Sequence, residues 1–294
     1  MSGKLLGYLF LALAMVTVGS TVIASKVIAS SLPPFTATAL RFAIALPFFL
    51  ALMRVTGTAL PKAGRGDWLL LLLQASAGSV GYTTLLITGL SHTSAADAGV
   101  IIGTLPVVSA TIAIVLLNER PRPSLLLAIG LAAFGVLFIT VQPGTEGRSP
   151  IGNALIFAAV ICEGLFILLN KRLRTPVAPL ALSTVMTAFG LAVALPVAAF
   201  ETSAAGMAST GALAAVAYYA LVPTVGGFVL WYAGAARVSG AEASLFTALA
   251  PVTAVAFAAL VLGEAVSGRQ MTGIACVLAA VLGLAFLQLS SSRA

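Results

Sequence analysis

The sequence is a succession of long apolar runs with short polar connections between them. A helix that crosses a bilayer needs about 20 predominantly apolar residues. None of the runs shows the strict alternation of apolar and polar residues that is typical of membrane β-strands. The pattern therefore predicts an all-α membrane protein with ten transmembrane helices. The ten segments are Leu5–Ser30, Pro34–Val55, Asp67–Leu90, Ser94–Leu117, Ser124–Val141, Ile151–Lys171, Leu180–Phe200, Gly211–Ala236, Ala241–Leu262 and Gly268–Leu289.

Composition strengthens the membrane interpretation and excludes several other classes. Of the 294 residues, 60% are hydrophobic and 8% are charged, whereas a soluble domain has about 25% charged residues. These proportions exclude a water-soluble globule, a disordered chain and a nucleic-acid-binding protein. Cys162 and Cys276 lie inside apolar runs, and His92 is the single histidine. We therefore expect no metal site, no disulfide framework and no cofactor.

The first apolar run has some features of a signal peptide. Lys4 precedes it, and Val22-Ile23-Ala24 resembles a cleavage site. The run is longer than the usual apolar core of a signal peptide, and the internal repeat described next requires it. We therefore expect it to remain as the first transmembrane helix.

The two halves of the sequence match at a constant offset of 145 residues. A serine, an acid, a proline and a glutamate recur with the same spacing in both halves, which divides the chain into residues 1–145 and 146–294. Each repeat holds five spans, and because five is odd the second repeat is inverted, as in many secondary transporters. The matched pairs are Gly7 and Gly152, Gly19 and Gly164, Lys26 and Lys171, Pro34 and Pro179, Gly81 and Gly226, Gly89 and Gly234, Ser94 and Ser239, Asp97 and Glu242, Pro106 and Pro251, and Glu119 and Glu264.

The lysines and arginines indicate how this topology is oriented. With the amino terminus inside, the inner segments hold eleven of them and the outer loops hold two, Arg148 and Arg269. Cytoplasmic loops of membrane proteins are enriched in these residues. The bias predicts a multi-pass membrane protein with both termini in the cytoplasm. The inner residues are Lys4, Arg54, Lys62, Arg65, Arg120, Arg122, Lys171, Arg172, Arg174, Arg237 and Arg293.

A repeated acid–proline–glutamate motif resembles a known family. It occurs as Asp97…Pro106…Asn118-Glu119-Arg120 and as Glu242…Pro251…Gly263-Glu264, with Gly130 and Gly135 in the helix after the first copy and Leu40-Arg41-Phe42 early in span 2. Together these residues resemble the drug/metabolite transporter superfamily, in its ten-helix branch with two EamA-type repeats. The chain is also similar to the inner-membrane exporters of aromatic amino acids in that branch. The resemblance implies a central cavity between spans 1–4 and 6–9, with spans 5 and 10 peripheral.

The function that follows is secondary transport, with export of aromatic or other apolar amino acids and related metabolites by alternating access. The sequence has no Walker A motif, so we expect no ATP hydrolysis. The alternatives are a carrier of another metabolite or drug class, a channel, an assembly factor and a membrane-embedded lipid enzyme. The enzyme would need a cluster of His, Asp or Cys residues that this sequence lacks, so we expect no catalytic residues. The expected partners are a small-molecule substrate and the lipid bilayer. A monomer is compatible with this fold. Transport is either coupled to protons or driven by the substrate gradient alone.

Residues that match across the repeats are interpreted as scaffold or hinge. Ser94 with Asp97, and Ser239 with Glu242, have the spacing of helix capping boxes, although a substrate or proton role is the alternative. Glu119 and Glu264 are expected to accept hydrogen bonds from the start of the helix that follows each of them. Lys26 and Lys171 are expected to be interfacial anchors.

Four residues are candidate hinges. Pro106 and Pro251 fall in the middle of spans 4 and 9, where each removes a helix hydrogen bond and kinks the chain. Gly226 and Gly227, beside Pro223, weaken span 8. A fixed kink is the alternative to a moving hinge at each position.

Polar and aromatic residues that break the repeat are better candidates for binding an asymmetric substrate. The alignment of the two repeats pairs Tyr82 with a glycine, Glu163 with a valine and Trp231 with a leucine. On the helix of Tyr82, the same side also carries Ser79 and Leu86. We assign these five residues to one substrate site, with ordinary helix packing as the alternative for the aromatics. Glu163 either binds a substrate ammonium, carries a proton or is a neutral structural group. Arg41, opposite Met186, either snorkels, pairs with another helix or binds a carboxylate.

Overall fold

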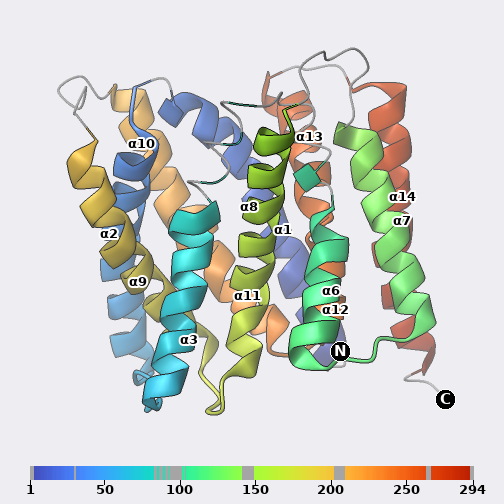
Figure 1. The fold of residues 1–294 in the computed structure, drawn as a ribbon, viewed down its shortest axis with the longest axis horizontal. Helices are drawn as coiled ribbons and strands as arrows, with labels where there is room; N and C mark the ends of the chain where they lie inside the picture. Colours follow the sequence, from blue (N-terminus) through green and yellow to red (C-terminus); the bar gives the residue numbers. More distant parts are fainter. Residues whose placement is uncertain are drawn as a thin grey trace.

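A computed structural model describes residues 3–29, 31–82, 85, 89, 92, 101–102, 104–140, 149–201, 209–262 and 266–291. Within these residues all regular structure is helical, and the helices lie side by side in one bundle (Figure 1). Helix α1 begins and α14 ends at the same end of this bundle, which we call the α1 end (Figure 1). The elements are α1 (Gly3–Ala29), α2 (Pro34–Thr56), α3 (Arg65–Ser76), η1 (Ala77–Gly81), α6 (Leu105–Leu117), α7 (Pro123–Thr140), α8 (Pro150–Leu168), η2 (Leu169–Arg172), α9 (Pro179–Phe200), α10 (Thr210–Tyr219), η4 (Ala220–Gly226), α11 (Gly227–Ala235), α12 (Gly240–Phe246), α13 (Leu249–Leu262) and α14 (Gly268–Ser291).

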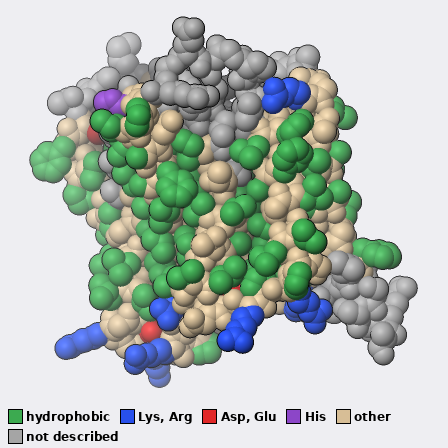
Figure 2. Space-filling model, turned by 45° about the vertical axis from the view of Figure 1, so that its right-hand side comes forward, with side chains coloured by type: hydrophobic (Ala, Val, Ile, Leu, Met, Phe, Trp, Pro, Cys, Tyr) green, Lys and Arg blue, Asp and Glu red, His purple; other side chains and the backbone are tan. Residues whose placement is uncertain are grey.

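The helices are long and apolar enough for a membrane protein. In the described residues seven helical stretches have the length and hydropathy to cross a bilayer, and Leu105–Leu117 and Pro123–Ile139 are shorter apolar helices. Apolar side chains cover much of the face seen in Figure 2, and most of the lysine and arginine side chains in that view lie at the α1 end. This distribution suits a protein whose sides face lipid and whose ends face water. The predicted all-α membrane protein is confirmed at this level.

Prolines and one glycine set several helix boundaries. Pro34, Pro150 and Pro179 each stand in the first turn of α2, α8 or α9, where proline loses no helical hydrogen bond. Helix α2 ends at Gly57, whose φ of 65° is left-handed and whose N–H bonds to the carbonyl groups of Arg54 and Met53. Glycine adopts this conformation without the steric penalty of a Cβ atom.

Small residues allow several helix pairs to pack closely. Helices α7 and α14 lie against each other at one edge of the bundle (Figure 1). A Cβ atom on Gly135 of α7 would lie 2.6 Å from the carbonyl oxygen of Gly273 of α14. Helices α1 and α11 are similarly close, because a Cβ atom on Gly234 of α11 would lie 2.9 Å from the carbonyl oxygen of Gly7 in α1. Glycine at such positions lets two helix backbones approach within contact distance.

The two prolines proposed as hinges follow breaks in the helices. Helix α12 ends at Phe246, the N–H groups of Thr247 and Ala248 bond to carbonyl groups three residues earlier, and α13 begins at Leu249. Helix α6 likewise begins at Leu105, after a bond from Thr104 N–H to the Ile101 carbonyl. Pro106 and Pro251 therefore lie in the first turn of a new helix. The sequence predicted an interrupted helix at each proline, and in the described residues the interruption lies just before the proline.

The two π-helical segments, η1 and η4, occupy corresponding positions in the two halves. Tyr82 follows η1, and its N–H bonds to the carbonyl of Ala77, five residues earlier. Segment η4 contains Pro223, and its helix continues through Gly226 and Gly227 into α11. A Cβ atom on Gly227 would lie 2.7 Å from Thr17 Oγ1 of α1. Close packing against α1 is thus a reason for this glycine besides flexibility.

Candidate functional site

Glu163 differs from every other acidic residue that the structure describes. Asp67, Glu119, Glu201 and Glu242 each accept at least one hydrogen bond. Glu163, on α8 inside a membrane-spanning stretch, has no hydrogen bond or ion pair with any described residue and is half-buried. A carboxyl group at this depth is costly and, in membrane proteins, usually marks a pathway for substrate or ions.

Two tyrosines from other elements lie near enough to Glu163 to interact electrostatically with its carboxyl group. They are Tyr82, at the end of η1, and Tyr232, on α11. Tyr82 is half-buried, whereas Tyr232 is fully enclosed. The structure thus brings together two of the five residues assigned to the site, Tyr82 and Glu163. It adds Tyr232, which lies one residue after the predicted Trp231.

Gln74 of α3 holds Tyr232 in place. The Gln74 amide nitrogen donates to the carbonyl of Phe166 at 2.5 Å and lies 3.5 Å from the hydroxyl oxygen of Tyr232. The amide oxygen is buried and has no partner among the described residues. The ring of Phe228 meets Tyr232 edge to face, with centroids 6.2 Å apart. Tyr232 therefore has an apolar ring against its own ring and a polar amide near its hydroxyl group.

Tyr219 extends this polar region toward α2. Tyr219 interacts electrostatically with Tyr82, and its ring lies 4.6 Å from the guanidinium carbon of Arg41. Arg41, Tyr219, Tyr82, Glu163 and Tyr232 form a connected series that we call the interior polar row. The five residues come from α2, α10, the end of η1, α8 and α11, so the row joins five elements of the bundle.

The other predicted site residues lie elsewhere or outside the described residues. Trp231 is 6% exposed and packs in the main apolar core, and its indole nitrogen is buried without a partner among the described residues. Consecutive helix positions point about 100° apart, so Trp231 and Tyr232 face different neighbours. The backbone of Ser79 belongs to η1, but its side chain lies outside the described part of the chain, as does Leu86.

Gln74 and Tyr219 were missed although the sequence carries a signal for both. They occupy equivalent positions in the two halves, because 74 plus the offset of 145 is 219. An amide in the first half is therefore aligned with a tyrosine in the second half. The rule that picks out unmatched polar residues would have identified this pair, as it identified Tyr82 and Glu163.

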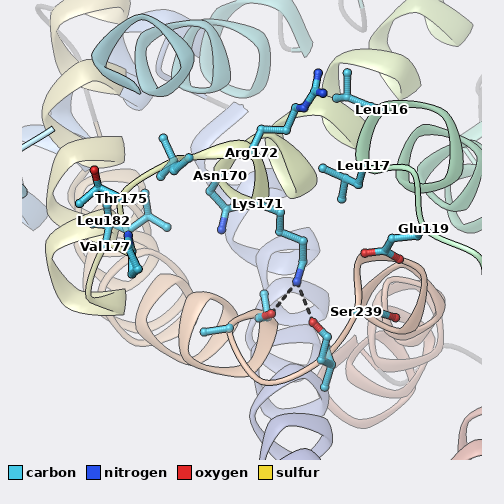
Figure 3. Close-up of a pocket in the computed structure, with 15 residues that line it drawn as sticks. Leu116, Leu117, Glu119, Asn170, Lys171, Arg172, Thr175, Val177, Leu182 and Ser239 are labelled. Atoms are coloured by element: carbon cyan, nitrogen blue, oxygen red, sulfur yellow. Dashed lines mark hydrogen bonds between the residues drawn. The ribbon is translucent and has the colours of Figure 1, made fainter. Parts of the chain in front are cut away.

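A cavity of about 540 Å³ opens at the α1 end, where α6 and α11 finish. The ammonium group of Lys171 points into a turn and donates to the carbonyl oxygens of Ala235 and Val238, both at 2.7 Å (Figure 3). Glu119 lies across from it on the cavity wall (Figure 3). Lys171 therefore binds the end of α11 and is half-buried. Lys26 has no described side chain.

Carboxylates beside this cavity fix the start of α12. The N–H of Glu242 donates to Ser239 Oγ at 3.1 Å and the N–H of Ser239 to the Glu242 carboxylate at 2.8 Å, so the predicted capping box is confirmed. Glu242 also accepts from the Tyr8 hydroxyl at 2.6 Å and from Lys4 at 3.1 Å. Asp97, its partner in the first half, lies outside the described residues.

Glu119 also caps α12, which lies in the other half of the chain. Its two carboxylate oxygens accept from the N–H groups of Gly240 at 2.6 Å and Ala241 at 2.9 Å. The sequence led us to expect the cap at the following helix, α7, so the predicted chemistry is correct and the predicted partner is wrong. Glu264, the equivalent residue in the second half, lies outside the described residues.

Comparisons with known proteins agree with this architecture. The chain matches the EamA-like transporter family twice, over residues 5–141 and 150–286. It is 34% identical to the uncharacterized transporter YetK of Bacillus subtilis over 280 residues, which are 93% of this chain and 85% of YetK. It is 27% identical over 216 residues to a protein of Streptantibioticus cattleyicolor named "Probable terminal-alkyne amino-acid exporter", covering 74% of this chain and 72% of that one.

A solved structure shares the fold. A crystal structure superimposes on this chain with a TM-score of 0.81 and 21% identity, covering 97% of each chain. The helical fold of this chain is therefore shared with a solved structure over nearly its whole length. The chain belongs to the EamA-like transporter family of the drug/metabolite transporter superfamily and is a multi-pass membrane transporter of small molecules.

Proposed function

We propose that this transporter exports amino acids with aromatic or other apolar side chains, without ATP hydrolysis, by alternating access. The observation that carries the proposal is Glu163, a membrane-embedded carboxyl group beside Tyr82 and Tyr232 with no partner among the described residues. A substrate ammonium group would supply the missing charge. The same carboxyl group can release and take up a proton, which gives proton coupling a defined place.

The side chains around Glu163 favour a substrate with a ring or a long apolar group. Tyr82 and Tyr232 offer apolar ring faces together with hydroxyl groups. Phe228 and Phe166 continue the aromatic surface, with centroids 5.9 Å apart. The name of the Streptantibioticus relative, an amino-acid exporter, points the same way.

We further propose that the chain crosses the membrane ten times as two inverted five-helix repeats, residues 1–145 and 146–294, around a central cavity. Equivalent helices pack in equivalent ways, which supports this arrangement. Helix α2 packs on its counterpart α9, and α7 packs on its counterpart α14. Helix α1 packs on α13, as α8 packs on α6. The grouping α10–η4–α11 would then form one span and α12–α13 another.

For the orientation, we propose cytoplasmic termini in the cell inner membrane. The common location of the start of α1 and the end of α14 supports an even number of crossings (Figure 1). The basic side chains at the α1 end support a cytoplasmic location for that end (Figure 2). A monomer contains the whole interior polar row, so no second copy is needed to complete it.

Alternating access would then move the helix segments on either side of the breaks before Pro106 and Pro251. A helix bends most readily where its regular hydrogen bonds, from each N–H to the carbonyl four residues earlier, are interrupted. Gly226 and Gly227 would allow a smaller adjustment where η4 passes into α11. In this proposal the cavity beside Lys171 is the cytoplasmic entrance.

Metabolite profiling tests the substrate class. Cells that overproduce the protein should accumulate more phenylalanine, tyrosine or leucine in the medium than cells without it, while the intracellular pools fall. An unchanged amino-acid distribution, with a different metabolite or drug exported instead, would contradict the amino-acid proposal and leave the transporter assignment intact.

Three variants test the site. Tyr82→Ala and Tyr232→Ala should reduce export of large apolar amino acids more than that of small ones, and Glu163→Gln should reduce export of all of them. Phe134→Ala is the matched control, because Phe134 is exposed on α7 at the edge of the bundle. Normal selectivity in all three variants would show that these side chains only pack helices together.

A further inference from the structure

Arg41 is a charged side chain that the proposed site does not yet use. It lies on α2, seven residues after Pro34, or about 10 Å below the end of the helix at 1.5 Å per residue. No described carboxylate forms an ion pair with it, and its Nε atom is buried without a hydrogen-bond partner among the described residues. The acid nearest to the start of α2, Glu201, is already bonded to the N–H groups of Phe35 and Thr36.

Aromatic rings hold the guanidinium group inside the bundle. Its carbon atom lies 4.3 Å from the ring centroid of Phe42 and 4.6 Å from that of Tyr219 on α10. These rings contact its faces, but they do not satisfy its N–H donors, which lie in the plane of the group. The repeat partner of Arg41 is Met186, so the scaffold does not require a charge at this position. The donors are thus available to an anionic ligand.

We propose that Arg41 binds the carboxylate group of the transported amino acid. This inference rests on the proposed function. A guanidinium group pairs with a carboxylate through two parallel hydrogen bonds, which a neutral amide cannot reproduce. In the interior polar row Arg41 contacts the ring of Tyr219, and Tyr82 interacts with both Tyr219 and Glu163. Glu163 is 13 residues after Pro150 and Arg41 is 7 after Pro34, so the acid lies about 9 Å deeper from the same end of the bundle.

The arrangement gives the row a polarity. A zwitterionic substrate meets a cation toward the end of the bundle opposite the α1 end and an anion nearer the middle, with tyrosine rings in between. Arg41 and Glu163 each select against substrate analogues that lack one of the two charged groups of an amino acid. An amino-acid amide lacks the anion that Arg41 recognises, and a carboxylic acid without an amino group lacks the cation that Glu163 recognises.

The experiment is competition against labelled phenylalanine in proteoliposomes, with phenylalanine, phenylalaninamide and 3-phenylpropionate as competitors. In the wild type, the amide should need at least about a tenfold higher concentration than phenylalanine, which corresponds to loss of one charged contact. Arg41→Gln should reduce that ratio to about twofold or less, whereas Glu163→Gln should instead reduce discrimination against 3-phenylpropionate. Arg54→Gln is the matched control, since Arg54 is exposed at the other end of the same helix.

The outcomes separate this inference from the proposed function. A wild-type protein that transports no amino acid overturns the proposed function. A wild type that transports phenylalanine but accepts its amide equally well overturns only the role of Arg41, and so does Arg41→Gln with wild-type discrimination. If Arg41→Gln does not fold, Arg41→Lys replaces it. Lysine keeps the charge without the paired donors, so reduced discrimination supports the proposal and unchanged discrimination contradicts it.

Discussion

Gly234→Ala is expected to weaken the packing of α11 against α1. A Cβ atom on Gly234 would lie 2.9 Å from the Gly7 carbonyl oxygen, 3.0 Å from the Leu11 backbone nitrogen and 2.8 Å from Leu11 Cγ. Two of these atoms belong to the backbone, so the contact cannot be relieved by rotating a side chain. The two helices would have to separate, and overpacking of this kind costs about 1–3 kcal/mol.

The size of the effect is best measured against a glycine that has space around it. Gly130 of α7 is exposed, and no atom lies within 4 Å of the position of its Cβ. Both substitutions replace glycine by alanine within a helix, so the gain in helix propensity, about 1 kcal/mol, is common to them. The free energy of unfolding of Gly234→Ala should therefore be about 1–3 kcal/mol below that of Gly130→Ala.

Reversible unfolding in mixed detergent micelles, followed by tryptophan fluorescence, gives both free energies. The inverted-repeat proposal extends the prediction to Gly89, whose Cβ would lie 2.6 Å from Ile156 Cδ1 and 3.2 Å from the Gly152 carbonyl oxygen. Gly89→Ala should be destabilising like Gly234→Ala. Equal stability of Gly234→Ala and Gly130→Ala would refute the close contact between α1 and α11.

Three further predictions concern the cap, the breaks and the topology. Glu119→Gln should lower the free energy of unfolding by about 1 kcal/mol, because the start of α12 loses a negative charge; an unchanged unfolding titration contradicts the cap. Pro106→Ala and Pro251→Ala should slow transport without lowering stability, and normal transport in both would mean that the breaks are static. Reporter domains fused to either terminus should both report the cytoplasm, and an external signal from one would overturn the proposed topology.

The helices could be predicted from the sequence because bilayer thickness imposes a simple length on apolar runs. Every stretch of the described residues that can span a membrane overlaps a predicted segment. The position of each break, just before Pro106 or Pro251, could not be predicted. The same local sequence is compatible with a proline in the first turn of a new helix and with a proline that kinks a continuous one. The partner of Glu119 was also unpredictable, since Gly240 is 121 residues away and only tertiary packing brings them together.

The candidate site was partly predictable for a different reason. Comparing the two halves identified Tyr82 and Glu163 as unmatched positions in the interior. It could not determine the direction of each side chain around its helix, and so it favoured Trp231 over its neighbour Tyr232. Helical direction is set by contacts such as that between Gln74 and the Tyr232 hydroxyl, which have no signature in the local sequence.

Efflux of labelled phenylalanine from ATP-free liposomes that contain the purified protein tests both the amino-acid substrate and the role of Glu163. Efflux should saturate as the internal concentration rises and should fall by at least about tenfold in Glu163→Gln, since loss of one member of a charge pair costs about 2–5 kcal/mol. Efflux no faster than from protein-free liposomes would contradict the amino-acid substrate, and saturable efflux that Glu163→Gln leaves unchanged would contradict the role of Glu163.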